Sequence, residues 1–123
     1  DVRELADGAV LDLAGLQVVV DHAPGHTRGS VMFRRAAQDG VPPVLLSGDV
    51  LFEGSIGRTD LPGGDHATML ASLAAKVLPL DDDTVVLPGH GGTTTIGRVR
   101  AGNPYLAALV EHADGPSAPA RGL

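Results

Sequence analysis

Short apolar runs, separated by clusters of glycine, proline and aspartate, recur along this chain. The run LQVVVDHA at 16–23 is rich in β-branched residues, and SVMFRRA at 30–36 and PVLLSGD at 43–49 alternate or are apolar. A shorter alternating segment lies between glycine turns within 1–15, and VVLPGH follows an acidic turn. Runs of this length, bounded by turn residues, predict β-strands.

Two other segments have the three- and four-residue spacing of helices. The first follows Asp65, a good N-cap, and ends at Pro79. Its apolar face consists of Met69, Leu70, Leu73 and Val77. The second covers 103–113, with Asn103 at the cap and Pro104 at the first helical position. We therefore expect two helices among the strands.

The connections add a hairpin and a long loop. AQDGVP, between the runs 30–36 and 43–49, contains Asp-Gly and predicts a β-hairpin. The segment 51–65 has no period and many glycines, and long loops without secondary structure tend to carry function. Strands interleaved with helices predict an α/β (α+β) domain with a mixed sheet and helices on one face. The other face, with its alternate valines and leucines, needs a partner layer.

Composition excludes several classes of protein. The formal net charge of −6 over 123 residues argues against nucleic acid, which favours a basic face. No apolar run is long enough to cross a membrane, and we expect a cytoplasmic protein. The absence of cysteine excludes disulfides and thiolate metal sites. A metal here must therefore be held by His, Asp or Glu.

Three side chains of this kind follow apolar runs, and each adjoins a glycine. They are His26, Asp49 and His90. Loops that leave the carboxyl ends of strands meet at one edge of a sheet, so these side chains are expected to lie together. Imidazole and carboxylate are suitable ligands for zinc or iron. The alternative is ordinary turn chemistry, since single Gly-Asp and Pro-Gly-His sequences are common in turns.

Two hydroxyl side chains, Thr27 and Ser30, follow His26 closely. A hydroxyl that bonds to a ligating imidazole fixes the orientation of its ring. Thr27 and Ser30 are therefore candidates for this supporting role.

Five separated motifs together resemble one family. HAPGHTRGS, LLSGDVLF and VVLPGHGG resemble the third, fourth and fifth motifs of the metallo-β-lactamase fold hydrolases, in the same order. FEGSIGRTDLPGGD and TTTIGRVRAGNPYL resemble the small, single-domain glyoxalase II-like branch, which hydrolyses thioesters such as hydroxyacylglutathiones. The resemblance covers residues 8–110.

The resemblance implies a metal-dependent hydrolase with two zinc ions and a bridging hydroxide. His26 would ligate the first metal and His90 the second, and Asp49, the residue expected to be catalytic, would bridge them. Iron or manganese would accept the same ligands. Such a metal pair lowers the pKa of bound water and polarises the thioester carbonyl, so that no cysteine or serine nucleophile is needed.

Arg58 stands where glutathione-binding relatives have a basic residue, which implies contact with a substrate carboxylate. The alternative is an ion pair within the loop, to Asp60 or Asp65. Those relatives have an aromatic residue at the position of Asp60. The thiol and the acyl group of the substrate therefore stay open.

The family's His-x-His-x-Asp-His motif, which supplies most of the ligands, is absent from these residues. We therefore interpret 1–112 as the C-terminal half of a metallo-β-lactamase-like domain, half of an αββα sandwich, and 113–123 as a flexible tail. The expected partners are a small-molecule thioester and the missing N-terminal half that carries this motif, or a second copy bound through the uncovered sheet face. Neither nucleic acid nor membrane is expected.

Each metal would keep two protein ligands from this chain, whereas catalytic zinc sites usually have three. We therefore expect weak metal binding and little activity from this chain alone.

Two other interpretations stay open. GRTD also occurs in the persulfide dioxygenase branch of the same fold, which uses one iron ion; His26 and Asp49 would then be ligands and His90 would not. The third interpretation is a non-catalytic interaction module, a half-fold that pairs with another chain.

Overall fold

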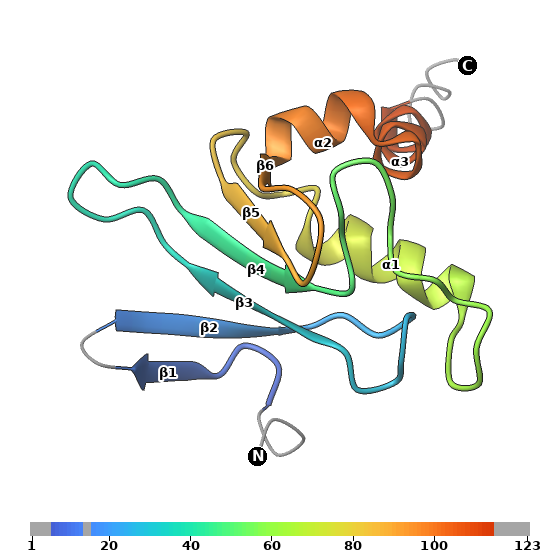
Figure 1. Cartoon of the computed structure of the whole chain (residues 1–123), viewed down its shortest axis with the longest axis horizontal. Helices are drawn as coiled ribbons and strands as arrows, with labels where there is room; N and C mark the ends of the chain where they lie inside the picture. The colour runs from blue at the N-terminus through green and yellow to red at the C-terminus, as the bar shows by residue number, and fades with distance from the viewer. Residues whose placement is uncertain (1–5, 14–15, 115–123) are drawn as a thin grey trace.

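The computed structural model describes residues 6–13 and 16–114, and these form one six-stranded sheet with three helices. The strands follow each other across the sheet in chain order: β1 (Val10–Leu13), β2 (Leu16–His22), β3 (Val31–Arg35), β4 (Val44–Gly48), β5 (Val85–Pro88) and β6 (Thr94–Thr95). The helices are α1 (His66–Lys76), α2 (Ile96–Gly102) and α3 (Pro104–Asp114), as Figure 1 shows.

The sheet is mixed, as the sequence predicts. β4 and β5 are parallel, whereas all the other neighbouring strands are antiparallel. The predicted hairpin joins β3 to β4 through Asp39 and Gly40, which both have positive φ angles, 49° and 80°. Two successive positive φ values define the tight turn that Asp-Gly favours. Gln38 and Val41 exchange backbone hydrogen bonds across it.

The directions of the strands decide where the loops emerge. Because β2 is antiparallel to β3 and β3 is antiparallel to β4, β2 runs in the same direction as β4. β5 is parallel to β4, so it also has this direction. The carboxyl ends of β2, β4 and β5 therefore lie at one edge of the sheet, and the loops that follow them start there.

The helices bury one face of the sheet. Met32, Leu45 and Val86 from the strands share a hydrophobic core with side chains of all three helices. The helical members of this core are Met69 and Leu73 of α1, Ile96 and Val99 of α2, and Leu106 of α3. Burying apolar area of this kind is the main stabilising contribution to the fold.

The opposite face of the sheet stays partly open. Leu46 lies across from Phe33 on β3 and from Leu87 on β5, so the three side chains share that face. Leu46 is 44% exposed and Leu87 is 36% exposed, whereas the neighbouring Leu45 is fully buried. The described residues therefore leave apolar side chains on the face for which the sequence predicts a partner layer.

The sequence prediction misses α2 and β6. α2 has only seven residues and includes Gly97 and Gly102, which weaken the helical signal. Its N-cap is Thr95, whose side chain accepts a hydrogen bond from the amide of Arg98. β6 has two residues, too few for any periodicity.

The two predicted helices are confirmed, with small changes at their ends. α1 begins after Asp65, whose side chain accepts from the amide of Thr68, and ends at Lys76, before Pro79. α3 begins after Asn103 and runs to Asp114, so it includes residues 113 and 114 of the predicted flexible tail. Residues 115–123 of that tail lie outside the described residues.

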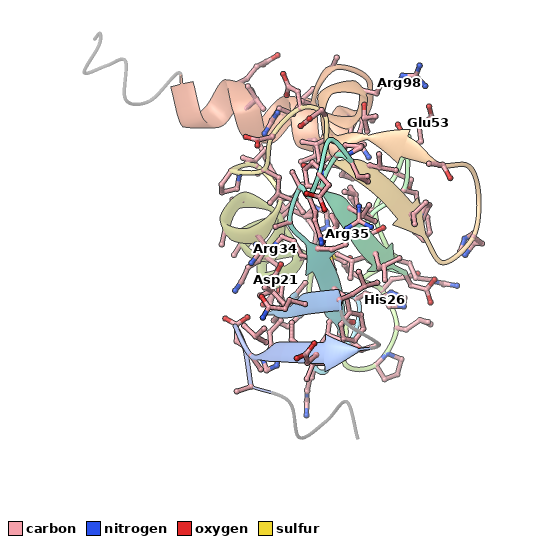
Figure 2. The ribbon with its side chains drawn as sticks, turned by 90° about the vertical axis from the view of Figure 1, so that its left-hand side faces the viewer. Asp21, His26, Arg34, Arg35, Glu53 and Arg98 are labelled. Atoms are coloured by element: carbon pink, nitrogen blue, oxygen red, sulfur yellow. The ribbon has the colours of Figure 1, made fainter. Side chains whose placement is uncertain are left out.

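An ion pair between a buried carboxylate and a half-buried guanidinium joins β2 to β3. Figure 2 shows Asp21 and Arg34 next to each other, and the guanidinium donates two hydrogen bonds to the carboxylate, at 2.7 and 3.1 Å. These hydrogen bonds raise the pKa of Arg34. Asp21 is buried, and its negative charge is matched there by the two donors of the guanidinium.

In the part of the chain that the structure describes, no helix is long and apolar enough to cross a membrane.

Because the two faces of the sheet differ in burial, we expect alanine to cost more stability at Leu45 than at Leu46. Leu45→Ala is expected to lower the free energy of unfolding by about 2–5 kcal/mol, because it empties space in the core. Leu46→Ala is expected to cost less than about 1 kcal/mol, because its side chain is partly exposed already. Urea denaturation of both variants measures the difference, and equal losses would show that both faces are covered in solution.

Candidate metal centre

His26, Asp49 and His90 line one hollow at the edge where β2, β4 and β5 end. The hollow has a volume of about 490 Å³. Its other lining residues come mainly from the loop after β4 and are Phe52, Ser55, Ile56, Gly57, Arg58 and Gly91. The structure thus brings together the three side chains that the sequence selects as metal ligands, although the first and the last are 64 positions apart in the chain.

Asp49 and His90 are neighbours because their strands are paired. Gly48 lies opposite Pro88 at the end of the parallel ladder, and the amide of Gly89 donates to the carbonyl of Gly48 at 2.8 Å. Nδ1 of His90 is 3.6 Å from a carboxylate oxygen of Asp49. Both side chains are mostly exposed, at 76% for His90 and 58% for Asp49, so their polar atoms face the hollow's solvent.

Glycine at position 89 leaves room for the carboxylate. A Cβ atom there would stand 2.9 Å from Oδ1 of Asp49. Real Cβ atoms essentially never approach an oxygen so closely, so either the carboxylate or the backbone would have to shift. The Pro-Gly-His sequence therefore has a steric reason beyond turn formation.

His26 is oriented by a backbone carbonyl. Its Nδ1 lies 2.8 Å from the carbonyl oxygen of Arg58, 32 residues further along the chain. A carbonyl can only accept, so Nδ1 carries the proton in this bond. In a neutral imidazole the lone pair is then on Nε2, which is the arrangement that a metal ligand requires.

Gly57 lies between two of the candidate ligands. A Cβ atom at this position would stand 2.0 Å from the carbonyl oxygen of Asp49 and 3.1 Å from Nδ1 of His26. The amide of Gly57 also donates to the carbonyl of Val50 at 2.9 Å. The loop after β4 thus folds back over its own start and passes His26 at close range, which only glycine permits.

Phe52 also lines the hollow, although nothing in the sequence selects it. Its ring centroid lies 4.6 Å from that of His90, with the planes tilted by 37°. The predicted functional loop, 51–65, therefore reaches both histidines, through Phe52 at one end and Arg58 further on. No motif marks Phe52, because its role depends on how the loop folds back.

Thr27 and Ser30 bond to each other instead of to an imidazole. Their hydroxyl oxygens are 2.7 Å apart, and the amide of Thr27 donates to the hydroxyl of Ser30 at 3.1 Å. These bonds close the turn after His26. The predicted orienting role thus falls to the carbonyl of Arg58, an acceptor that every residue type has and that the sequence therefore does not reveal.

Arg58 forms the ion pair that was the alternative to substrate contact. Its guanidinium donates two hydrogen bonds to the carboxylate of Asp60, at 2.8 and 3.0 Å. These bonds raise the pKa of Arg58 and lower the pKa of Asp60. Both side chains are exposed, and Arg58 is one of the residues that line the hollow. In this arrangement the positive charge of Arg58 is matched by a charge of the same chain.

The ligand set is chemically suitable but incomplete. Two imidazoles and a carboxylate are donors that zinc and iron accept. Among residues 6–13 and 16–114, however, no three His, Cys, Asp or Glu side chains come close enough to hold one ion. The described residues therefore offer part of a metal centre.

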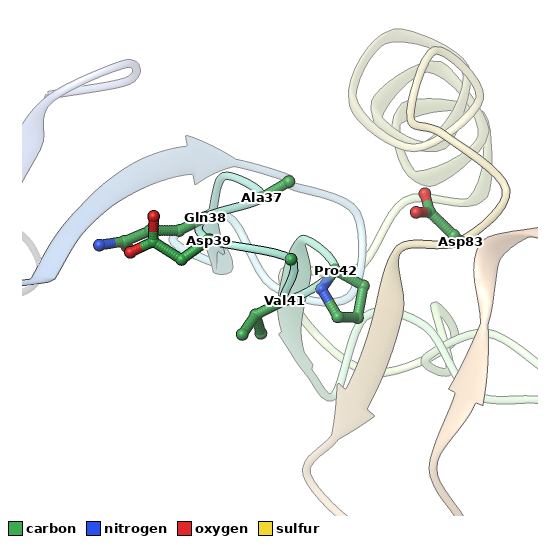
Figure 3. A pocket seen from close by; sticks show the side chains of 7 residues that line it. Ala37, Gln38, Asp39, Val41, Pro42 and Asp83 are labelled. Atoms are coloured by element: carbon green, nitrogen blue, oxygen red, sulfur yellow. The ribbon is translucent and has the colours of Figure 1, made fainter.

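A second hollow, of about 470 Å³, lies at the tip of the β3–β4 hairpin, beside Asp83 (Figure 3). Its lining residues come just before the starts of β4 and β5. The hollow is therefore at the opposite edge of the sheet from Asp49 and His90, which follow the ends of these strands. Its lining contains two carboxylates, Asp39 and Asp83, and no imidazole. It takes no part in the arrangement described above.

The chain matches the Metallo-beta-lactamase superfamily over residues 1–90. It belongs to this superfamily. One relative, an uncharacterized protein of Mycobacterium tuberculosis (strain H37Rv), is 54% identical over 104 residues, which are 84% of this chain and 46% of the relative. Hydroxyacylglutathione hydrolase GloC of Haemophilus influenzae is 44% identical over 81% of this chain and 45% of its own length.

Solved structures agree with this membership. The B3 metallo-β-lactamase BLEG-1 superposes with a TM-score of 0.74 at 47% identity, over 83% of this chain and 47% of that protein. TTHA1623, solved in a di-iron-bound form, superposes with a TM-score of 0.68 at 44% identity, over 85% of this chain and 48% of that protein. The chain thus spans about half the length of the relatives that it matches.

Because the backbone passes so close to Gly57, we expect alanine to cost much more stability there than at Gly54 in the same loop. Gly57→Ala is expected to lower the free energy of unfolding by about 1–3 kcal/mol, because the new methyl group overlaps the backbone of Asp49. Gly54→Ala is the matched control, since a Cβ there meets nothing within 4 Å. Its change is expected to stay within about 0.5 kcal/mol. Equal melting curves for the two variants would contradict the geometry described for this loop.

Proposed function

We propose that this chain provides half of the active site of a glyoxalase II-like thioester hydrolase, a hydroxyacylglutathione hydrolase-like member of its superfamily. The observation that carries the proposal is the convergence of His26, Asp49 and His90 on one hollow at the carboxyl edge of the sheet. The identity to hydroxyacylglutathione hydrolase GloC supports the choice of branch. The absence of cysteine fits a reaction that needs no thiol nucleophile.

In this proposal His26, through Nε2, Asp49 and His90 hold a pair of divalent metal ions. Zinc is the ion that we propose; iron is the alternative, because TTHA1623 is similar to this chain and its structure is a di-iron form. When bound, such ions lower the pKa of water and polarise a carbonyl group. The protein's own contribution is to place the ligands, with Gly57 and Gly89 providing space and Phe52 shielding one side of the His90 ring.

The remaining ligands come, in this proposal, from an N-terminal half that carries the His-x-His-x-Asp-His motif. Two observations support it. The described ligand set is incomplete, and the relatives are about twice as long as the matched segment. The half-exposed Leu46 and Leu87 provide an apolar face on which that half packs. Covering this face would then also complete the site.

The proposal predicts that metal binding depends on the added half. This chain alone is expected to retain less than one zinc ion per chain, whereas a fusion to the N-terminal half of the Mycobacterium tuberculosis relative is expected to retain zinc and hydrolyse a hydroxyacylglutathione. Metal content is measured by mass spectrometry and hydrolysis by loss of the thioester absorbance. Tight zinc binding by the lone chain would contradict the incomplete site, and a metal-free, inactive fusion would contradict the proposed function.

Asp49→Asn and Asp83→Asn in that fusion form a matched pair. Asp49→Asn removes a metal-ligand charge, and its loss of metal affinity is expected to exceed the ~10–100-fold that outer partners of ligands cost. Asp83 is an exposed carboxylate at the opposite edge of the sheet, so Asp83→Asn is expected to keep both metal and activity. Equal losses in the two variants would place the metal elsewhere.

If Arg58 contacts a substrate carboxylate, changes at Arg58 and Asp60 should alter KM for a charged thioester but not for a neutral one. Asp60→Ala would release the guanidinium, so KM for a glutathione thioester is expected to fall about two- to fivefold, the scale of an exposed ion pair. Arg58→Ala is expected to raise this KM by a similar factor. The same acyl group on a neutral thiol is the control, and its KM is expected to stay unchanged. Equal effects on both substrates would show that Arg58 acts only within the loop.

A further inference from the structure

Asn103 connects the junction of two helices to the loop that lines the hollow. Its side chain is fully buried between the end of α2 and the start of α3. The amide nitrogen donates to the carbonyls of Phe52 and Ser55, at 3.0 and 2.9 Å. The amide oxygen accepts from the backbone of Tyr105 and Leu106, at 2.9 and 3.4 Å. One side chain thus caps α3 and holds a loop about fifty residues away in sequence.

Among the side chains, only the amides of asparagine and glutamine can make all of these hydrogen bonds at once. Two donors and an acceptor are needed at once in a buried place, and a carboxylate or a hydroxyl lacks the two donors. Glutamine is one methylene longer and would displace the loop or the cap. Without this amide the carbonyl of Phe52 would lose its hydrogen bond from Asn103, and the carbonyl of Ser55 would keep the one from the Phe52 amide. The partly buried turn would then be held less firmly, because a hydrogen bond lost from such a place weakens the structure that it joins.

The segment that Asn103 holds leads to both histidines. The amide of Phe52 donates to the carbonyl of Ser55 at 2.9 Å, which closes the turn between the two held carbonyls. At the start of that turn the Phe52 ring packs on His90. Beyond its end, Gly57 passes His26 and the carbonyl of Arg58 binds its Nδ1. Movement of the turn would therefore change the surroundings of both rings.

We propose that Asn103 is a positioning residue for the metal centre, one that sets His26 and His90 through the loop it clamps; this proposal rests on the proposed metal-dependent function. Asn103 does not line the hollow, so it acts only through the loop. The clamp joins α2 and α3 to the site, which makes the helical layer part of the site's support.

The test compares two substitutions that keep the helix cap and remove the clamp. Asn103→Asp is isosteric and keeps an oxygen for Tyr105, and Asn103→Ser keeps a good N-cap acceptor in a smaller, uncharged side chain. The matched control is Arg100→Met. Arg100 lies on α2, three residues before Asn103, and donates to the carbonyls of Leu78 and Leu80, so it holds a different loop.

The first readout is zinc affinity of the fusion described above, by competition with a chelator. Both Asn103 variants are expected to bind zinc about 10–100-fold more weakly, the range found when outer partners of ligands are removed. Arg100→Met is expected to lose thermal stability but to keep zinc affinity within about twofold of the unsubstituted protein. Unchanged affinity in the Asn103 variants, or an equal loss in Arg100→Met, would overturn the proposal.

The second readout is amide hydrogen exchange in this chain without metal. The amides of Phe52 and Gly57 are expected to be protected in the unsubstituted chain and to exchange much faster in the Asn103 variants only. If neither variant folds, the unsubstituted chain alone still tests the proposal. Rapid exchange at its Phe52 and Gly57 amides would show that Asn103 does not hold the loop in place. A fusion that binds no zinc at all would overturn the proposed function together with this inference, whereas tight binding in every variant overturns the inference alone.

Discussion

The parallel pairing of β4 with β5 is the constraint on which the site depends. It sets Gly48 against Pro88 and closes with the hydrogen bond from the Gly89 amide to the Gly48 carbonyl. Asp49 and His90 follow these residues directly, so their separation is fixed by backbone geometry that the core behind Leu45 and Val86 stabilises. Sites built on the strands of a scaffold are more precise than sites on loops, so ligands that directly follow two paired strands need little reorganisation to bind an ion.

Close approach of the backbone is the second requirement, and glycine meets it. The loop after β4 returns past Asp49 and His26 at Gly57, and the turn after β5 passes the Asp49 carboxylate at Gly89. A third glycine, Gly25, has a φ of 138° and stands where a Cβ would lie 2.3 Å from the backbone of Met69. It thereby seats the His26 turn on α1. The glycines near the three ligands are thus a consequence of packing as much as of turn formation.

The sequence predicts the architecture well where the signal is local. The strands, the Asp39–Gly40 hairpin and the caps at Asp65 and Asn103 follow from periodicity and turn chemistry. The convergence of the three candidate ligands follows from strand direction. α2 escapes prediction because two glycines dilute its pattern, and the carbonyl of Arg58 escapes because a backbone acceptor has no residue-specific signal. The second bond set of Asn103 depends on tertiary contacts that a cap motif does not contain.

The measurement that tests the central claim most directly is anomalous X-ray diffraction at the zinc absorption edge, from crystals of the metal-loaded fusion. The account predicts anomalous density within about 2.0–2.2 Å of Nε2 of His26, of a carboxylate oxygen of Asp49 and of a ring nitrogen of His90, the usual zinc–ligand distances. Density away from these three side chains, or beside the carboxylates at 81–83, would contradict it.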